Sequence, residues 1–295
     1  MIHTLVLIAG TCRALYGEVL FYNPGDKDGF SGKYSHTPYP YSVVNVTEPA
    51  YRGTDAMRCE VRYGDDKIQY HATRCYLPGF ENNRTLFYGM AFYIQDNFSF
   101  VSTAVTWFSQ FGITAWNPGS TKVWLPLCIL YIGAHELGNI RFAPSRNDAG
   151  VLIQSDPVVK KMPLAGGAGW HTVVMEVKWT HLPEGYLRVW LDGHMGIEWK
   201  NIITYPDSAK AVFDHRWSAE CYVPSWKKRE PKPEETNPRV MVFDEIRIAT
   251  RFEEAVPKSD ATGFNRHRYG IRHATEQPFA QPASAFDIRG RCFPI

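Results

Sequence analysis

Apolar and polar side chains alternate along much of the chain, which is the pattern that β-strands produce. Residues Thr85 to Ile94 are apolar or aromatic on both faces, so we expect a central strand of a sandwich there. No stretch keeps apolar residues at helical spacing over three turns. The sequence therefore predicts an all-β protein built as an antiparallel β-sandwich. The other expected strands are Ser102 to Phe111, Val123 to Ile132, Trp170 to Trp179, Tyr186 to Leu191 (leading into a hairpin turn at Asp192-Gly193) and Val240 to Ala249.

The segment from Met57 to Cys75 predicts a hairpin with an unusual polar face. Strand alternation places Arg58, Glu60 and Arg62 on one side of its first strand. A tight turn follows, and the second strand carries His71. Two guanidinium groups held in place by a carboxylate would suit an anionic ligand. The alternative is a solvated ladder of ion pairs, and the segment alone does not decide between them.

Loop composition favours one domain. A chain of 295 residues could form one large all-β domain or two smaller ones, and no internal repeat divides it. Residues Asp156 to Gly169 and Pro224 to Pro238 are rich in Pro, Gly or charge and are predicted to be surface loops rather than linkers. Strand alternation stops at Asp260. We expect a β-sandwich domain over residues 18–259 and a C-terminal tail, residues 260–295, packed on it.

The N-terminus resembles a short secretory signal. Leu5 to Gly10 form an apolar run, and Ala14 to Gly17 offer small residues at a cleavage position, although the preceding region has only His3 as a basic group. We therefore expect residues 1–17 to be a signal and the mature chain to be secreted. No other segment is long and apolar enough to cross a bilayer. Three possible N-glycosylation sites support export, at Asn45, Asn83 and Asn97.

Removal of the signal would leave five of the six cysteines, enough for two bridges and one free thiol. Cys59 with Cys75 and Cys221 with Cys292 are plausible pairs, and the spacing alone does not choose them. A metal site built on cysteine or histidine has little support, because neither CxxC nor HxxxH spacing occurs.

Composition narrows the classes of molecule that we expect the protein to bind. Aromatic residues make up 14% of the chain, which suits both strands and sugar-binding surfaces. The net charge of +2 is too small to argue for a nucleic acid or a membrane surface. We expect neither as a partner, and we expect a monomer.

Familiar catalytic motifs are missing: GxSxG, HExxH, the P-loop and GxGxxG do not occur. Glu60, Glu176 and Glu245 each lack a second acid two residues away on their strand. Hydrolysis by paired acids therefore has no local support, although carboxylates can converge from separate strands.

Three polar residues on separate expected strands remain as candidates: His71, Gln110 and Tyr222. Gln110 interrupts an otherwise apolar strand, and its amide needs a partner if it is buried, so it faces solvent or a ligand. Taken singly, each of the three is more often a structural residue.

The order of several segments resembles that of the jelly-roll (concanavalin-like) polysaccharide lyases, most closely the glucuronan lyases of polysaccharide lyase family 20. The resemblance extends over roughly Glu18 to Thr250. Its most specific part is the order of three features along the chain: the hairpin with arginines and His71, then Gln110 on a strand, then Tyr222. The supporting segments are Met57 to Arg62, Leu86 to Ile94, Trp107 to Phe111, Trp170 to Trp179, Gly185 to Gly193 and Val242 to Ala249.

The resemblance implies cleavage of a polyuronate by β-elimination, in which a base removes the C5 proton and the O4-linked sugar leaves. It assigns Tyr222 as base and acid, and His71 and Gln110 as the groups that neutralise the C6 carboxylate. The expected substrate-binding residues are Arg58, Glu60, Arg62, Arg74 and Trp107.

Two departures from the motifs of related lyases bear on the choice of substrate and of catalytic base. Related alginate lyases carry a Gln-x-His pair, whereas Phe111 and Gly112 follow Gln110 here, which argues against alginate. They also place their Tyr in a Lys-x-Gly-x-Tyr context that this chain lacks. The alternative candidates for the base are Tyr63, Tyr76 and Tyr205.

The resemblance also implies a structural calcium ion and no cofactor for the chemistry. Asp244, with an acid from the Asp26-Lys27-Asp28 loop, could supply its oxygens, and ordinary turn residues are the alternative reading of that loop. A second function from another class stays open, a non-catalytic jelly-roll protein that binds acidic polysaccharides. A third is a hydrolase with acids from separate strands, which would release saturated products.

Overall fold

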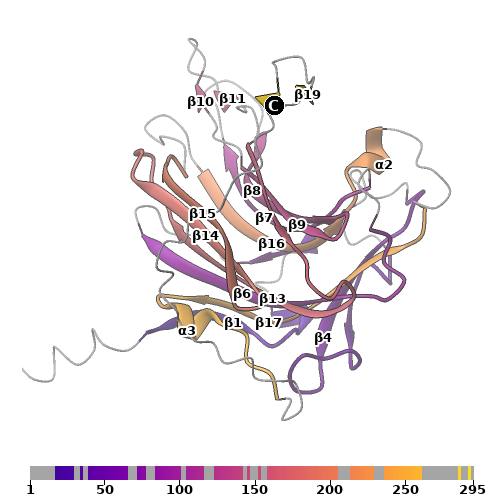
Figure 1. Cartoon of the computed structure of the whole chain (residues 1–295). Helices are drawn as coiled ribbons and strands as arrows, with labels where there is room; N and C mark the ends of the chain where they lie inside the picture. The colour runs from indigo at the N-terminus through magenta and orange to yellow at the C-terminus, as the bar shows by residue number, and fades with distance from the viewer. Residues whose placement is uncertain are drawn as a thin grey trace, which may run out of the picture. The chain divides into compact units, whose positions relative to one another are not determined.

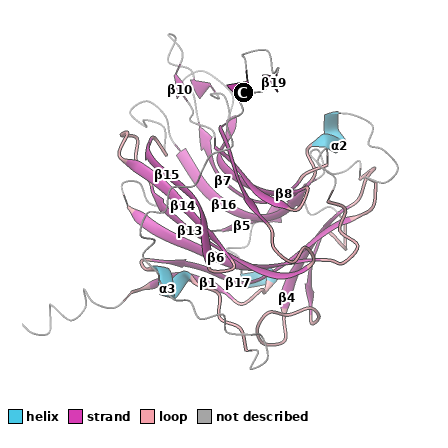
Figure 2. Ribbon diagram, in the orientation of Figure 1, coloured by secondary structure: helices cyan, strands magenta, loops and turns pink. Residues whose placement is uncertain are grey.

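The structure is a computed structural model of the 295-residue chain, and almost all of its regular structure is β-strand (Figure 2). Contacts divide the chain into two units, residues 1–261 and 262–295. In the second unit the structure describes one strand pair, β18 (Ala285–Phe286) with β19 (Cys292–Phe293). The expected packing of residues 260–295 on the sandwich stays a prediction. The described residues are 17–29, 34–35, 39–65, 72–77, 84–100, 104–115, 123–141, 145–146, 152–153, 158–204, 213–228, 236–260, 285–286 and 292–293.

The first sheet of the larger unit has the strand order β15-β14-β13-β6-β17-β4-β3, with β1 also paired to β17 (Figure 1). Every neighbouring pair is antiparallel. Its strands are β1 (Val19–Asn23), β3 (Val43–Val46), β4 (Ala56–Val61), β6 (Thr85–Ile94), β13 (Gly169–Lys178), β14 (Gly185–Leu191), β15 (His194–Ile202) and β17 (Arg239–Ala249).

The second sheet has the order β12-β9-β8-β7-β16-β5-β2 and is also antiparallel throughout. A short separate pair joins β10 (Ser145–Arg146) to β11 (Leu152–Ile153). The strands of the second sheet are β2 (Tyr34–Ser35), β5 (Ala72–Leu77), β7 (Thr106–Ala115), β8 (Val123–Gly133), β9 (Glu136–Arg141), β12 (Val158–Pro163) and β16 (Phe213–Tyr222).

Large aromatic side chains fill the space between the two sheets. Phe111 and Trp217 stack with ring centroids 5.6 Å apart, and Tyr88 packs edge-on against Phe111 at 4.7 Å. The indole Nε1 of Trp179 donates a hydrogen bond to the Tyr88 hydroxyl at 2.8 Å, so this polar atom is satisfied within the core. The expected antiparallel sandwich is thereby confirmed, with one apolar core shared by both sheets.

The central strand β6 is covered on both faces, as its sequence predicted. Its outer face lies under the short helix α3 (Phe252–Ala255), where Phe252 packs edge-on against Phe87 at 6.5 Å. A side chain at Gly89 would place its Cβ 1.8 Å from the carbonyl oxygen of Ala255. Glycine is therefore needed at this position for the helix to approach the sheet.

Several expected elements need correction. Part of the predicted loop from Asp156 to Gly169 is strand β12, an edge strand that ends at Pro163, and proline is tolerated at such an edge. Residues Ser225–Lys228 form the one-turn helix α2 inside the predicted Pro-rich loop. The turn at Asp192-Gly193 is confirmed, with positive φ at both residues.

The two suggested disulfides are wrong. Cys59 and Cys221 are buried thiols in the core between the sheets. The Cys221 Sγ donates to the carbonyl oxygen of Arg239 at 3.2 Å, and burial raises the pKa of this thiol well above its ordinary value. In the part of the chain that the structure describes, no helix has the length and apolar character needed to span a membrane.

Candidate active site

Strand alternation in β16 fixes which side chains leave the core. Trp217, Ala219 and Cys221 belong to the core cluster. The residues between and after them, Ser218, Glu220 and Tyr222, therefore project from the opposite, outer face of the second sheet. Figure 1 shows β16 beside β7 in this sheet, followed directly by α2.

Gln110 of β7 lies on the same outer face and is held by β16. Its side-chain Nε2 donates to both carboxylate oxygens of Glu220, each at 2.8 Å. Its backbone N–H donates to the Ser218 hydroxyl at 3.2 Å. Gln110 is 1% exposed and Glu220 is fully buried. The partner that a buried strand glutamine requires is thus a carboxylate on the neighbouring strand.

Tyr222 lies at the end of β16 in a small aromatic cluster with Trp107 and Tyr39. The Trp107 ring meets the Tyr222 ring edge-on, with centroids 5.0 Å apart and an interplanar angle of 84°. The two residues are register partners across β7 and β16. Gln110, Tyr222 and Trp107, three of the predicted site residues, therefore share one face of one sheet.

Strand β5 borders β16 on its other side. Arg74 is the register partner of Glu220, and Ala72 is the register partner of Tyr222. Directly opposite residues of an antiparallel pair project from the same face, so position 74 belongs to the outer face. The side chain of Arg74 is outside the described residues, as is all of His71, which precedes Ala72 in the sequence.

Arg58, Glu60 and Arg62 do not join this face. Arg58 and Glu60 lie on β4 of the first sheet, and Arg62 comes directly after it. The residues that alternate with them, Met57, Cys59 and Val61, fill the core. Both arginines pair with the Glu60 carboxylate, Arg58 through Nη2 and Arg62 through Nε. The triad is thus a ladder of ion pairs on the outer side of the first sheet, in which Glu60 is buried and both arginines are partly exposed.

Arg62 nevertheless connects with the aromatic cluster around Tyr222. Its guanidinium lies over the ring of Tyr41, 3.7 Å from the centroid, and Tyr41 stacks on Tyr39 at 5.2 Å and 7°. Tyr39 in turn packs against Tyr222. A continuous row of Arg62, Tyr41, Tyr39, Tyr222 and Trp107 therefore runs from the end of β4 onto the outer face of the second sheet.

Asp65 fixes the start of this row. Its Oδ1 accepts the Tyr41 hydroxyl at 2.5 Å, and its Oδ2 accepts the backbone N–H of Arg62 at 2.8 Å. Burial and the bond to Asp65 raise the pKa of Tyr41 well above its ordinary range, so this phenol stays protonated. The hydrogen bond to Glu60 raises the pKa of Arg62, which stays charged. Among the described residues, Nη1 and Nη2 of Arg62 have no hydrogen-bond acceptor, and the side chain is 49% exposed.

The alternative tyrosines are placed less favourably. Tyr63 is 42% exposed and meets Trp226 of α2 edge-on at 5.8 Å. Tyr76 is the register partner of Ser218, but its side chain lies outside the described residues, and so does all of Tyr205. Tyr222 shares the outer face with Gln110 and lies against Trp107. Tyr131 of β8, the register partner of Trp107, lies on the same face.

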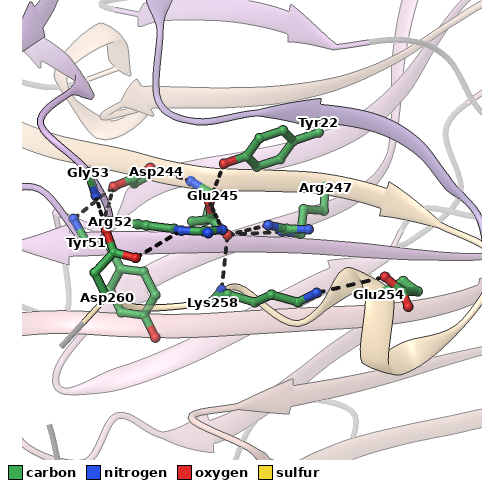
Figure 3. Close-up of polar contacts among 10 residues, drawn as sticks. All are labelled: Tyr22, Tyr51, Arg52, Gly53, Asp244, Glu245, Arg247, Glu254, Lys258 and Asp260. Carbon is green, nitrogen blue, oxygen red and sulfur yellow. Dashed lines mark hydrogen bonds and ion pairs between the residues drawn. The ribbon is translucent and has the colours of Figure 1, made fainter. Parts of the chain in front are cut away.

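The carboxylate of Asp244 does not have the geometry expected of a calcium ligand. Its Oδ2 accepts the backbone N–H groups of Tyr51 and Arg52 at 2.8 and 2.9 Å, and its Oδ1 accepts that of Glu245 at 2.6 Å (Figure 3). Oxygens that face N–H donors are not directed at a cation. Burial raises the pKa of Asp244 to about 6 despite these bonds. Within the described residues, no group of three acidic, histidine or cysteine side chains is placed to hold a metal.

A dense polar network surrounds Asp244, and it is structural. β17 bulges between Asp244 and Arg247, and Glu245 adopts a positive φ of 51° there. Its carboxylate accepts the Tyr22 hydroxyl at 2.5 Å and the Arg247 Nη2 at 2.6 Å (Figure 3). Burial raises the pKa of Tyr22 to about 12. Each Glu245 oxygen is thus occupied by donors of the protein itself.

Sequence reasoning missed Glu220, Tyr39 and Tyr41. Glu220 had a detectable signal, since it stands two residues before Tyr222 on the same strand and therefore on the same face. Tyr39 and Tyr41 lie in the irregular segment before β3, where no periodicity predicts which way a side chain points.

Two solved structures and a family model are similar to this chain. Endo-β-1,4-glucuronan lyase from the fungus Trichoderma reesei has a similar structure, with a TM-score of 0.70 and 22% identity, covering 82% of this chain and 100% of that chain. The PL-14 alginate lyase from Aplysia kurodai has a TM-score of 0.50 and 9% identity, covering 78% and 98%. These likenesses confirm the jelly-roll fold. No curated protein sequence matches the chain. The polysaccharide lyase model matches residues 22–247, so the chain belongs to the polysaccharide lyase family.

Proposed function

We propose that this polysaccharide lyase cleaves a polyuronate, β-1,4-linked glucuronan, by β-elimination on the outer face of its second sheet. The observation that carries the proposal is the meeting of Gln110 and Tyr222 on that face, beside the aromatic ring of Trp107. Gln110 supplies an amide for carboxylate recognition, and Tyr222 supplies a phenol for proton transfer.

The reaction needs two kinds of group. A C5 proton is too weakly acidic to be removed until the neighbouring C6 carboxylate is neutralised by hydrogen bonds. Gln110 and His71 perform this task in the proposal: Gln110 lies on the outer face, and His71 is carried over from the family pattern. Tyr222 takes the C5 proton, the C4–O4 bond breaks as the C4=C5 bond forms, and the leaving oxygen receives a proton from the same phenol.

A polymer substrate needs further contacts along its length. Arg62 is suited to a neighbouring uronate, because Glu60 and Tyr41 fix its guanidinium while its half-exposed end can reach a carboxylate. Arg74, at the register position opposite Glu220, is proposed as a cation under the reacting sugar. Arg58 sits midway along β4 between β3 and β17, away from this row, and we assign it a structural role.

Glucuronan is proposed over alginate on two grounds. The fungal structure that resembles this chain over its whole own length is described as an endo-β-1,4-glucuronan lyase. The strand of Gln110 also lacks the Gln-x-His pair of the related alginate lyases. Secretion and glycosylation are parts of the same proposal, supported by the N-terminal sequence and by the exposed positions of Asn45 and Asn97. A monomeric state is proposed with them.

The test is the ultraviolet absorbance of newly formed unsaturated uronate ends. Purified protein is incubated with glucuronan, alginate and a pectic polyuronate as separate substrates. Absorbance that rises with glucuronan supports the proposal, and a rise with alginate alone moves the substrate assignment to alginate. Saturated reducing ends without absorbance would show hydrolysis and overturn β-elimination.

A further inference from the structure

Glu220 is a fully buried carboxylate in the middle of the proposed active-site face. Burying an ionised acid is costly unless hydrogen bonds or charges compensate it, so its position calls for an explanation. Its neighbours on β16, Ser218 and Tyr222, face the same way. Strand alternation thus brings a carboxylate to the surface on which a polyanion is expected to bind.

The contact with Gln110 supplies that explanation. Both Glu220 oxygens lie 2.8 Å from a single nitrogen, Nε2 of Gln110. The two oxygens of one carboxylate lie close together, so one N–H of the amide bridges them. The planar amide group then directs its second N–H away from Glu220. A carboxylate accepts hydrogen bonds and cannot donate them, so this contact also decides which end of the amide is nitrogen.

We propose that Glu220 is a positioning residue that orients the Gln110 amide for the substrate carboxylate. This inference rests on the proposed function, in which Gln110 donates to the C6 carboxylate. A glutamine amide that is able to flip can also present its carbonyl oxygen, and that oxygen repels a carboxylate. With Glu220 in place, the second N–H is a donor in a fixed direction, which is the form that stabilises the developing enolate.

Two further contacts make this arrangement rigid. The Ser218 hydroxyl accepts the backbone N–H of Gln110 at 3.2 Å and lies 3.4 Å from its carbonyl oxygen, to which it can donate. The β7 backbone, the amide and the acid are therefore fixed together before any substrate arrives.

The experiment is a double-mutant cycle with glucuronan as the substrate, measuring kcat and KM for wild type, Gln110→Ala, Glu220→Ala and the double variant. Loss of orientation at a reacting group costs about 100-fold in rate. Glu220→Ala should therefore lower kcat by about that factor. In the Gln110→Ala background the same change should cost less than about twofold, because no amide is left to orient. Equal losses in both backgrounds would overturn the proposal.

A second cycle with Glu220→Gln keeps the test independent of whether Glu220→Ala folds. The substituted amide retains an acceptor oxygen for the Gln110 amide, so kcat of this variant should lie between those of wild type and Glu220→Ala. Again the loss should vanish in the Gln110→Ala background, and a persistent loss would contradict the proposal.

Glu176→Gln is the matched control for burial. Glu176 is 8% exposed on β13 of the first sheet and accepts the Tyr186 hydroxyl and the Arg188 Nη1, each at 2.9 Å. Its loss should lower the thermal midpoint and leave kcat unchanged. If wild type cleaves no polyuronate, the proposed function fails; if it cleaves glucuronan while the cycles are additive, only the role of Glu220 fails.

Discussion

The Trp107 indole meets the Tyr222 ring edge-on at 5.0 Å, and the phenol is thereby held at the end of β16. This edge-on geometry is a favoured aromatic contact, and it restricts the rotation of both rings. Proton transfer depends on such placement, because the base must lie within hydrogen-bond reach of the proton that it removes.

Tyr222→Phe should abolish turnover while leaving polymer binding intact. Removal of the hydroxyl deletes the proposed base but keeps the ring that packs on Trp107, and such a loss costs at least about 100-fold in kcat. Unsaturated-end absorbance measures turnover, and affinity electrophoresis in glucuronan gels measures binding. Tyr63→Phe removes the same atom from an exposed ring and should leave kcat unchanged. The reverse pattern would transfer the base to Tyr63.

Arg62→Gln should raise KM with little change in kcat, because the guanidinium contacts a sugar that does not react. Loss of a charge-assisted hydrogen bond to a carboxylate corresponds to a KM increase of about tenfold or more. The effect should shrink as salt is added. Arg58→Gln breaks the other ion pair of Glu60 and serves as the control. A similar KM rise in both variants would mean that the ladder acts only through folding.

His171 should make the stability of the sandwich depend on pH. Its Nδ1 lies 2.8 Å from Asp192 Oδ2 and its Nε2 lies 3.0 Å from the carbonyl oxygen of Gly167. Both partners are acceptors, so both contacts favour the imidazolium form, which donates from both ring nitrogens. Burial lowers the pKa of His171, but the hydrogen bond to Asp192, the charge of Asp192 and the bond to Gly167 outweigh it, so the pKa lies above its ordinary value.

A raised folded-state pKa stabilises the protein fully below the unfolded pKa, near 6.5, and the contribution is lost as the pH rises through the folded pKa. The wild-type thermal midpoint should therefore fall from about pH 6.5 upward, and His171→Gln should flatten this slope. His194→Gln changes an exposed histidine and should leave the slope intact. A slope unchanged in His171→Gln would assign the pH dependence to another group.

Asp244→Asn should destabilise the protein whether or not calcium is present. Any orientation of an asparagine amide turns its N–H groups toward a backbone N–H, and an unsatisfied buried donor costs about 1–3 kcal/mol. The free energy of unfolding, measured with denaturant in calcium and in chelator, should show the same loss in both. A wild-type stabilisation by calcium that disappears in Asp244→Asn would restore the metal assignment.

The sequence predicted where the strands lie along the chain better than it predicted the sheet, and therefore the outer face, to which each strand belongs. Thr85 to Ile94 is strand β6 with the same bounds, since apolar residues on both faces leave no alternative to a central position. Alternation also placed Arg58, Glu60 and Arg62 correctly on one side of their strand. A sandwich has two outer faces, however, and alternation does not say to which sheet a strand belongs.

The candidate site was predictable where a single strand carried the signal. Gln110 in an apolar strand required a partner, and the structure supplies Glu220. The link from Arg62 to Tyr222 depends on the irregular segment that holds Tyr39 and Tyr41, and its path is set by tertiary packing. Contacts of that kind have no local sequence pattern.

The network around the β17 bulge marks a natural place to shorten the chain. Asp260 accepts Arg52 Nε at 3.1 Å and the Gly53 N–H at 2.8 Å, and it is the last residue of that network. The first unit ends at Ala261. A stop codon after this residue keeps every hydrogen bond in Figure 3, whereas one before Lys258 removes two of its anchors. We therefore expect a chain that ends at Ala261 to keep this network intact.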